Sequence, residues 1–328
     1  MRKALMKNFI WITSLLLIGT SQGFCDPYPA YKRSDEVGFS INGDFLYWYW
    51  NLGEKDYAVR QEFTATGTLL NDIFFIDPDW RPGFRLQGEY RFSTPWDLIT
   101  KYTFIRLKGS GSIDGPDILD TLTPGVGALD FARSFLTVHY HVFDLALARV
   151  VQPRESLVFR YTFGARIPWM KQRWKNLYQL QDNAPPHLPL GSVRSNWDLV
   201  GGGPTIGAEG KWNYYDGLYI LGSASCAVVY TRTKVRMLAV FANPPTSNDA
   251  NLNERAHKIN PMVDMSLAFG WNSSDSNDAR VNLAIGGEIA YWWNVDEQIR
   301  RSPTAFFDHI RGGALSLMGI FVRGGIDY

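Results

Sequence analysis

The sequence predicts an all-β chain that folds as a single antiparallel transmembrane β-barrel of about 12 strands, within a range of roughly 10–16. Three observations predict this fold. An export signal occupies the first residues of the 328-residue chain. Long segments then alternate apolar and polar side chains, as half-exposed strands do. After the signal, no apolar run reaches the roughly 20 residues that a membrane-spanning helix requires.

The export signal has the three parts of a secretory signal peptide. Basic residues precede the apolar run 9–18, and small or polar residues follow it at 19–23. Small side chains near the exit predict cleavage between Gly23 and Phe24. The predicted organisation is therefore a signal peptide at 1–23, a short N-terminal segment at 24–36 and an outer-membrane β-barrel at 37–328.

Two alternatives concern this N-terminal region. The apolar run is too short for an uncleaved helical anchor. Lipidation of Cys25 is disfavoured because Phe24 is larger than the residue that usually precedes a lipidated cysteine. An intrachain disulfide between Cys25 and Cys226, an intermolecular disulfide and two free thiols all remain open.

The clearest predicted strand is 80–92. Its one face carries Trp80, Phe84, Leu86, Tyr90 and Phe92, and its other face is densely charged. Aromatic residues at both ends of an apolar face are typical of a strand that crosses a bilayer with a polar lumen behind it. At about 3.3 Å per residue and a tilt near 45°, this segment also matches the roughly 25 Å apolar band of such barrels.

The same alternation recurs in order along the chain. Convincing strands are predicted at 37–49, 80–92, 96–104, 136–142, 157–167, 202–212, 217–234, 259–271, 281–293 and 317–328, with weaker candidates at 57–61 and 64–75. Short turns are predicted at 93–95, 213–216 and 272–278, and longer polar or Pro-rich loops at 108–129, 179–194, 243–254 and 296–307. Short turns therefore belong to one rim and long loops to the other.

Composition separates this fold from its rivals. A secreted β-sandwich would also alternate, but it would seldom place aromatic residues at both ends of successive strands. The formal net charge of +1 excludes a global basic excess of the kind that nucleic-acid binding requires.

Several stretches resemble the pore-forming, major-outer-membrane-protein-like family of Legionella and chlamydia-related bacteria. The matching stretches are Gly-Asp-Phe-Leu-Tyr-Trp at 43–48, Pro-Gly-Phe-Arg at 82–85, Trp-Asp-Leu at 96–98, Tyr-Thr at 102–103, Phe-Asp-Leu at 143–145, Phe-Gly-Ala-Arg at 163–166 and Gly-Pro-Thr-Ile-Gly at 203–207. The resemblance spans about residues 38–328. It implies a porin-like outer-membrane channel without catalytic residues.

The candidate functional residues are charges on the face of each strand that should point into the lumen. They are Asp44, Arg81, Arg85, Glu89, Arg91, Arg160, Arg166, Asp264 and Glu288. Charges that line a pore bias its ion selectivity. The alternative is that these charges pair across strands and only fill the wall.

The sequence thus predicts a porin-like channel in the bacterial outer membrane for passive diffusion of ions and small hydrophilic solutes. The partners expected are outer-membrane lipid and these solutes, with no nucleic acid, and a homo-oligomer is left open. A surface barrel with a plugged lumen is the first alternative and a membrane-embedded hydrolase is a weaker one. No enzymatic activity, cofactor or metal is expected, and His139 and His141 are interpreted as polar wall positions rather than metal ligands.

Overall fold

The computed structural model describes residues 38–53, 55–63, 69–92, 96–121, 129–154, 156–180, 191–215, 217–241, 250–273, 279–301 and 307–328. All of them belong to one compact unit, residues 33–328. The predicted signal peptide at 1–23 and the predicted segment at 24–36 lie outside the described residues. So do the predicted cleavage site and Cys25.

Strands make up nearly all of the described residues, as predicted. Their bounds are β1 (Gly38–Leu52), β2 (Asp56–Phe63), β3 (Leu69–Phe75), β4 (Asp77–Pro78), β5 (Arg81–Arg91), β6 (Trp96–Asp120), β7 (Leu129–Arg154), β8 (Leu157–Leu180), β9 (Gly191–Tyr215), β10 (Leu218–Phe241), β11 (Ala250–Asn272), β12 (Arg280–Arg301) and β13 (Phe307–Asp327). No helix in these parts of the chain is long and apolar enough to cross a membrane.

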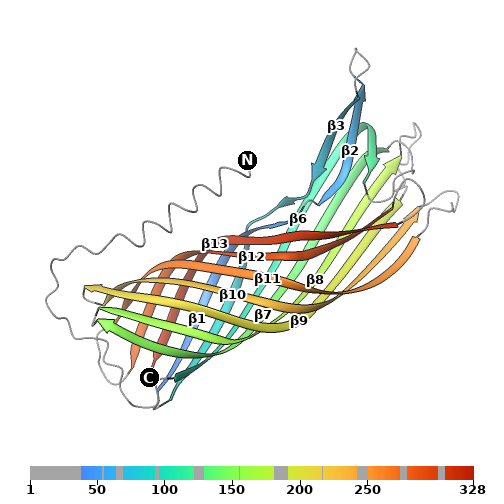
Figure 1. The fold of residues 1–328 in the computed structure, drawn as a ribbon. Helices are drawn as coiled ribbons and strands as arrows, with labels where there is room; N and C mark the ends of the chain where they lie inside the picture. The colour runs from blue at the N-terminus through green and yellow to red at the C-terminus, as the bar shows by residue number, and fades with distance from the viewer. Residues whose placement is uncertain are drawn as a thin grey trace. The chain divides into compact units, whose positions relative to one another are not determined.

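Ten of the described strands close into a ring, which confirms the predicted antiparallel barrel (Figure 1). The order around the ring is β6, β5, β1, β13, β12, β11, β10, β9, β8 and β7, and β7 pairs back onto β6. The ring therefore has ten strands, at the lower end of the expected range. The remaining strands, β2 to β4, lie in the connection between β1 and β5; β2 and β3 form a hairpin that pairs with β6 near Ala58–Arg60. This hairpin accounts for the two weaker candidate strands.

The two rims differ in their connections, as the sequence predicted. Residues 92–95, 155–156, 216–217 and 273–279 connect the strands at one end, which we call the turn rim. Residues 53–80, 121–128, 181–190, 242–249 and 302–306 connect them at the other end, the loop rim. The start of β1 lies beside the end of β13 at the turn rim, where Phe39 N donates to the carbonyl oxygen of Tyr328 at 3.0 Å.

The strands extend further towards the loop rim than the sequence indicated. The segment 108–129, predicted as a loop, is strand up to Asp120, and β6 is 25 residues long. The alternation fails as a signal here because polar side chains suit the outer face once the strand has left the membrane. The prediction of long loops therefore overestimated their lengths at this rim.

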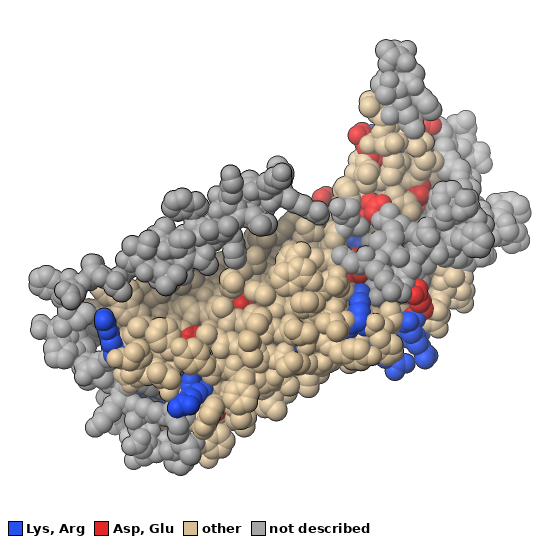
Figure 2. Space-filling model, in the orientation of Figure 1, with Lys and Arg blue, Asp and Glu red and all other residues tan. Residues whose placement is uncertain are grey.

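An apolar band surrounds the outside of the barrel between two rings of aromatic residues. Near the turn rim, the exposed aromatics include Phe39, Tyr90, Trp212, Trp271 and Tyr328. Nearer the loop rim, the exposed aromatics include Tyr47, Trp80, Tyr230 and Trp293, which we call the loop-side girdle together with Phe104, His141 and Trp169 on the same outer face. On the face shown in Figure 2, the middle of the barrel is largely free of Lys and Arg, which lie towards the two rims. This pattern is the one that lipid exposure requires.

Chemical labelling of the Cys226 thiol can test whether the apolar band lies in lipid. Cys226 is exposed on the outer face of β10, and its register neighbours Ile206 and Val263 are apolar. In vesicles that hold the Cys25→Ser variant, we expect a lipid-soluble maleimide to label Cys226 and a membrane-impermeant maleimide to leave it unlabelled. The matched control adds Cys226→Ser and Asn196→Cys, because Asn196 is an exposed position of β9 towards the loop rim, and should react with both reagents. Rapid reaction of Cys226 with the impermeant reagent would contradict the band.

Candidate functional site in the barrel lumen

The lumen near the turn rim holds a first group of charges centred on Asp44 of β1. Arg85 on the neighbouring β5 places Nη1 at 3.1 Å from Asp44 Oδ2, and Arg323 on the other neighbour, β13, places Nε at 2.7 Å from Asp44 Oδ1. Arg85 also reaches Glu288 of β12, with 2.9 Å between Nη2 and Oε2. Trp48 Nε1 donates to the second oxygen of Glu288 at 2.8 Å. Each of these charges therefore has an opposite charge within hydrogen-bonding distance.

A second group lies across the lumen on β7, β8 and β11. Arg166 Nε is 2.6 Å from Asp144 Oδ1, and its Nη1 is 2.6 Å from Asp264 Oδ2. Lys101 Nζ approaches Asp144 at 3.2 Å, and Ser225 Oγ donates to Asp264 at 2.8 Å. Arg166 is almost completely buried, so these carboxylates compensate the cost of burying its positive charge.

A third group sits closest to the turn rim. Arg160 of β8 makes two hydrogen bonds with the carboxylate of Glu89 on β5, at 2.9 and 2.8 Å. Glu209 lies 3.7 Å from the same guanidinium, and Asp97 lies 4.0 Å from it. The bidentate geometry fixes the planes of both groups, which a mobile pore-lining charge would not need.

Seven of the nine predicted residues meet in these three groups: Asp44, Arg85, Glu89, Arg160, Arg166, Asp264 and Glu288. The other two do not. Arg81 pairs with Asp79 in a partly exposed contact outside the groups, and Arg91 donates to the carbonyl oxygen of Tyr328 at the turn rim, at 3.3 Å. The seven residues thus pair with charges on other strands, and their role in lining a pore stays a prediction.

Sequence reasoning did not select several members of the groups, including Arg323, Asp144 and Lys101. A signal existed for Arg323, because it lies on the lumen-facing phase of the final strand. The signal for Asp144 was obscured, because the predicted strand 136–142 ends before it and its apolar side chains suggested a lipid-facing phase.

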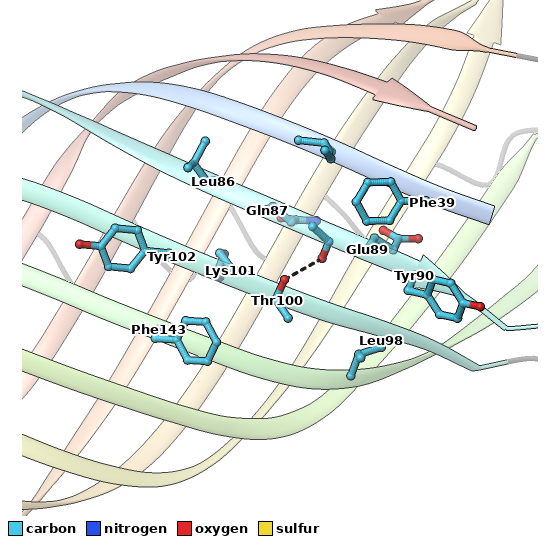
Figure 3. A pocket seen from close by; sticks show the side chains of 12 residues that line it. Phe39, Leu86, Gln87, Glu89, Tyr90, Leu98, Thr100, Lys101, Tyr102 and Phe143 are labelled. Carbon is cyan, nitrogen blue, oxygen red and sulfur yellow. Dashed lines mark hydrogen bonds between the residues drawn. The ribbon is translucent and has the colours of Figure 1, made fainter. Parts of the chain in front are cut away.

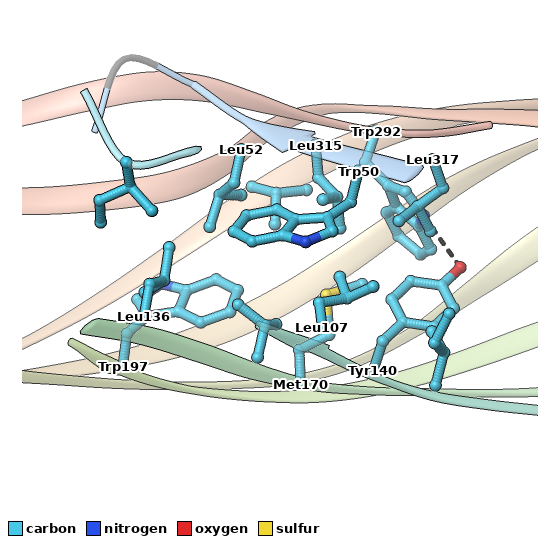
Figure 4. Packing of buried hydrophobic residues seen from close by; sticks show 14 of the residues in the cluster. Trp50, Leu52, Leu107, Leu136, Tyr140, Met170, Trp197, Trp292, Leu315 and Leu317 are labelled. Carbon is cyan, nitrogen blue, oxygen red and sulfur yellow. Dashed lines mark hydrogen bonds between the residues drawn. The ribbon is translucent and has the colours of Figure 1, made fainter. Parts of the chain in front are cut away.

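The lumen nearer the loop rim is packed mainly with apolar side chains. It also encloses a buried ion pair between Lys55 and Asp296 at 2.5 Å and a hydrogen bond from Ser134 Oγ to Asn176 Oδ1 at 2.7 Å. Side chains from most of the ten strands meet there, as Figure 4 shows. The labelled members are Trp50, Leu52, Leu107, Leu136, Tyr140, Met170, Trp197, Trp292, Leu315 and Leu317. Trp292 Nε1 donates to Tyr140 Oη at 3.2 Å. These two residues stand on β12 and β7, which are five strands apart in the ring of ten, so this hydrogen bond joins opposite walls.

This packing reverses the expected orientation of one segment. Leu136, Val138, Tyr140 and Val142 are buried inside the barrel, and the alternating residues Thr137, His139 and His141 face outwards. The interpretation of the two histidines as lumen wall positions was therefore wrong. The physical reason is that the lumen itself is apolar at this level. Among the residues that the structure describes, no group of three His, Cys, Asp or Glu side chains is arranged to hold a metal ion.

A shallow groove of about 440 Å³ lies across β1, β5, β6 and β7 (Figure 3). Outward apolar side chains dominate its lining, among them Phe39, Leu86, Tyr102 and Phe143. The groove is also lined by Gly88, whose carbonyl oxygen accepts a hydrogen bond from Thr100 Oγ1 at 3.3 Å. Its composition matches that of the surrounding lipid-facing band.

Comparisons with known proteins agree with this architecture. The profile of a family described as Legionella pneumophila major outer membrane protein precursor matches residues 34–327. A search of curated proteins finds no match.

Similar solved structures include three outer-membrane proteins. The outer membrane protease OmpT from Escherichia coli is 11% identical, with 89% of this chain and 96% of that chain covered and a TM-score of 0.41. The Pseudomonas putida toluene transporter TodX is 11% identical, with 90% of each chain covered and a TM-score of 0.22. A Pseudomonas aeruginosa FadL homologue is 8% identical, with 90% of each chain covered and a TM-score of 0.21. These scores are too low to carry an argument about this chain.

The family match carries the assignment because it covers nearly all of the barrel, from before β1 to the end of β13. It also agrees with the two girdles of exposed aromatic residues, the difference between the turn rim and the loop rim, and the closed antiparallel sheet. The chain is a β-barrel of the outer membrane and belongs to the Legionella major outer membrane protein family.

Proposed function

We propose that this outer-membrane barrel is closed to free diffusion and acts as a surface scaffold, with its loop rim displayed outside and its packed lumen sealing the membrane. This is the plugged-barrel role that the sequence left open. The observation that carries the proposal is the hydrogen bond between Trp292 and Tyr140, which joins opposite walls of the lumen.

The burial of the surrounding side chains supports the proposal. Trp292, Trp197 and Tyr140 have exposed fractions of 0%, 1% and 2%. In a water-filled pore, side chains on the lumen face would be wetted, since hydrated solutes pass beside them. Here the inward side chains contact one another instead, as in a domain core.

The charged groups nearer the turn rim support the same role. Removing a buried charge from its partner is costly, so residues such as Arg166 are held by their carboxylates and do not move freely. No catalytic role forms part of this proposal.

A narrow, ion-selective channel is the second candidate, and the charged half of the lumen favours it. Arg85, Asp44 and Glu288 would set a local field for ions that reach them. Hydrophobic constrictions can gate channels by excluding water. In this second role, the Tyr140–Trp292 contact would be the gate and would have to separate before ions pass.

Planar-bilayer recordings test the proposal. We expect the purified, folded protein to give no steady conductance steps, because the apolar part of the lumen excludes hydrated ions. Heat-modifiable gel mobility of the same sample establishes that the barrel is folded. Stable conductance steps from the folded barrel would contradict the scaffold role, and the reversal potential in a salt gradient would then report the sign of the ion preference.

A further inference from the structure

We propose that the outer face of β6–β11 carries a binding surface for a phosphorylated glycolipid of the outer leaflet. The surface is a basic belt made of Arg106, His139, Lys171, Arg173, Arg232, Lys234, Arg236 and Arg255. The inference rests on the outer-membrane location of the barrel and is independent of whether the lumen is closed.

The belt lies immediately beyond the loop-side girdle. On β6, Arg106 is the next outward position after Phe104. On β8, Lys171 is the next outward position after Trp169, and on β10 Arg232 is the next after Tyr230. One outward step is two residues, or about 5 Å of height in a tilted strand. Aromatic girdles mark the headgroup level of a bilayer, so the first cations of the belt lie among the headgroups.

The cations are neighbours in space as well as in level. In the strand register, His139 stands between Arg106 and Lys171. Partial burial, followed by the positive charges of Arg106, Arg173 and Lys171, lowers the pKa of His139. On the far side of the belt, Lys234 is opposite Arg255 in the register. Arg232 and Arg236 flank Lys234 on the same face of β10.

Asp198 is the acidic exception in this row. It stands between Lys171 and Lys234 in the register. Like charges placed opposite each other destabilise neighbouring strands. A cluster of this density is therefore expected to recruit an anionic ligand from outside the protein.

Among the positions whose side chains the structure describes, the belt does not continue onto β1 and β13. At the corresponding outward positions of β1 and β13, the residues are Asn51 and Ser316, which are uncharged. A general attraction for headgroups would not require such an asymmetry. A localised surface fits one multiply phosphorylated molecule, whose phosphates contact the cations and whose apolar chains lie along the band below.

The orientation selects the leaflet. In barrels of this kind, short turns face the periplasm and longer loops face outwards. The belt lies towards the loop rim, so the lipid beside it belongs to the outer leaflet, where the phosphorylated glycolipid of the outer membrane resides. Lys and Arg suit phosphate groups at such a surface because each can donate charge-assisted hydrogen bonds.

Binding of lipid A to the folded full-length barrel in detergent micelles tests the proposal. The test variant is Arg106→Gln/Lys171→Gln, and the matched control is Arg149→Gln/Arg154→Gln, which removes the same charge from exposed positions of β7 near the turn rim. We expect the test variant to bind lipid A about 30-fold more weakly, since each Lys or Arg beside an anionic surface contributes roughly a fivefold effect. The control should bind like the wild type.

Three further arms identify the ligand. Dephosphorylated lipid A should bind about as weakly to the wild type as lipid A binds to the test variant. Phosphatidylglycerol and inorganic phosphate should each fail to displace lipid A at equal concentration. Equal binding of dephosphorylated lipid A, or displacement by either competitor, would overturn the assignment. Should the test variant not fold, salt titration of the wild type decides: binding that does not weaken between low and high salt refutes the proposal.

Discussion

Replacement of Arg166 by leucine is expected to lower the free energy of unfolding of the barrel by about 3–5 kcal/mol. The guanidinium is almost completely buried and lies 2.6 Å from both Asp144 and Asp264. Without the guanidinium, Asp264 loses this ion pair, and Asp144 keeps its contact with Lys101 at 3.2 Å. The cost arises from these uncompensated charges, and urea unfolding of the barrel in lipid vesicles measures it.

Two controls separate this cost from a general effect of losing arginine. Arg81→Leu removes a partly exposed partner of Asp79 and should cost less than about 1 kcal/mol. The triple variant Arg166→Leu/Asp144→Asn/Asp264→Asn should recover much of the lost stability, because no unpaired buried charge then remains. An Arg166→Leu variant no less stable than Arg81→Leu would mean that water reaches the second group and that the lumen is open there.

The double variant Tyr140→Ala/Trp292→Ala is expected to conduct ions, whereas the proposed function predicts no conductance for the wild-type barrel. The two side chains join opposite walls through a 3.2 Å hydrogen bond and are almost entirely buried. Their removal leaves a cavity in the apolar part of the lumen, and a stability loss of about 3–5 kcal/mol is expected for each large aromatic removed. Conductance steps in planar bilayers should appear for this variant.

The matched control removes the same residue types from the outside. Tyr230 and Trp271 are exposed on the outer face, so Tyr230→Ala/Trp271→Ala should stay silent in the bilayer. If the inner and outer variants behave alike, the contact between Tyr140 and Trp292 does not contribute to the seal.

Much of the fold was predictable from the period-two alternation. The exposed side chains of Phe39, Phe45 and Tyr47, set against inward Asp44, follow the predicted faces of the first strand. The phase of Arg85 and Glu89 on β5 was likewise predictable, because a charge on the lipid side at mid-bilayer is costly.

The sequence could not show which face of a strand points outwards at levels where the lumen itself is lined by apolar side chains. Around Tyr140, the alternation marks two faces but does not say which is outside, and the answer depends on Trp292, 152 positions away. The same holds for the ion pairs: Arg166 and Asp264 are 98 positions apart. Their meeting depends on the ring size and on the stagger between strands, which no local pattern contains.

The basic belt illustrates the same limit. The pattern around Lys171 and Arg173 suggests a strand end near anionic headgroups, but Arg106 and Arg255 belong to strands far apart in the chain. Only the antiparallel register brings these cations onto one face.

The pairing of β1 with β13 has a consequence for how the barrel is assembled. Ser40 lies opposite Asp327, so the seam that closes the ring joins segments nearly 300 positions apart. Before β13 arrives, the growing sheet has two unpaired edges, and each edge can recruit strands from other chains. Contacts this distant in sequence also form slowly. We therefore expect the exported chain to depend on a holding factor during transit, and deletion of β13 should yield aggregated protein instead of a smaller barrel.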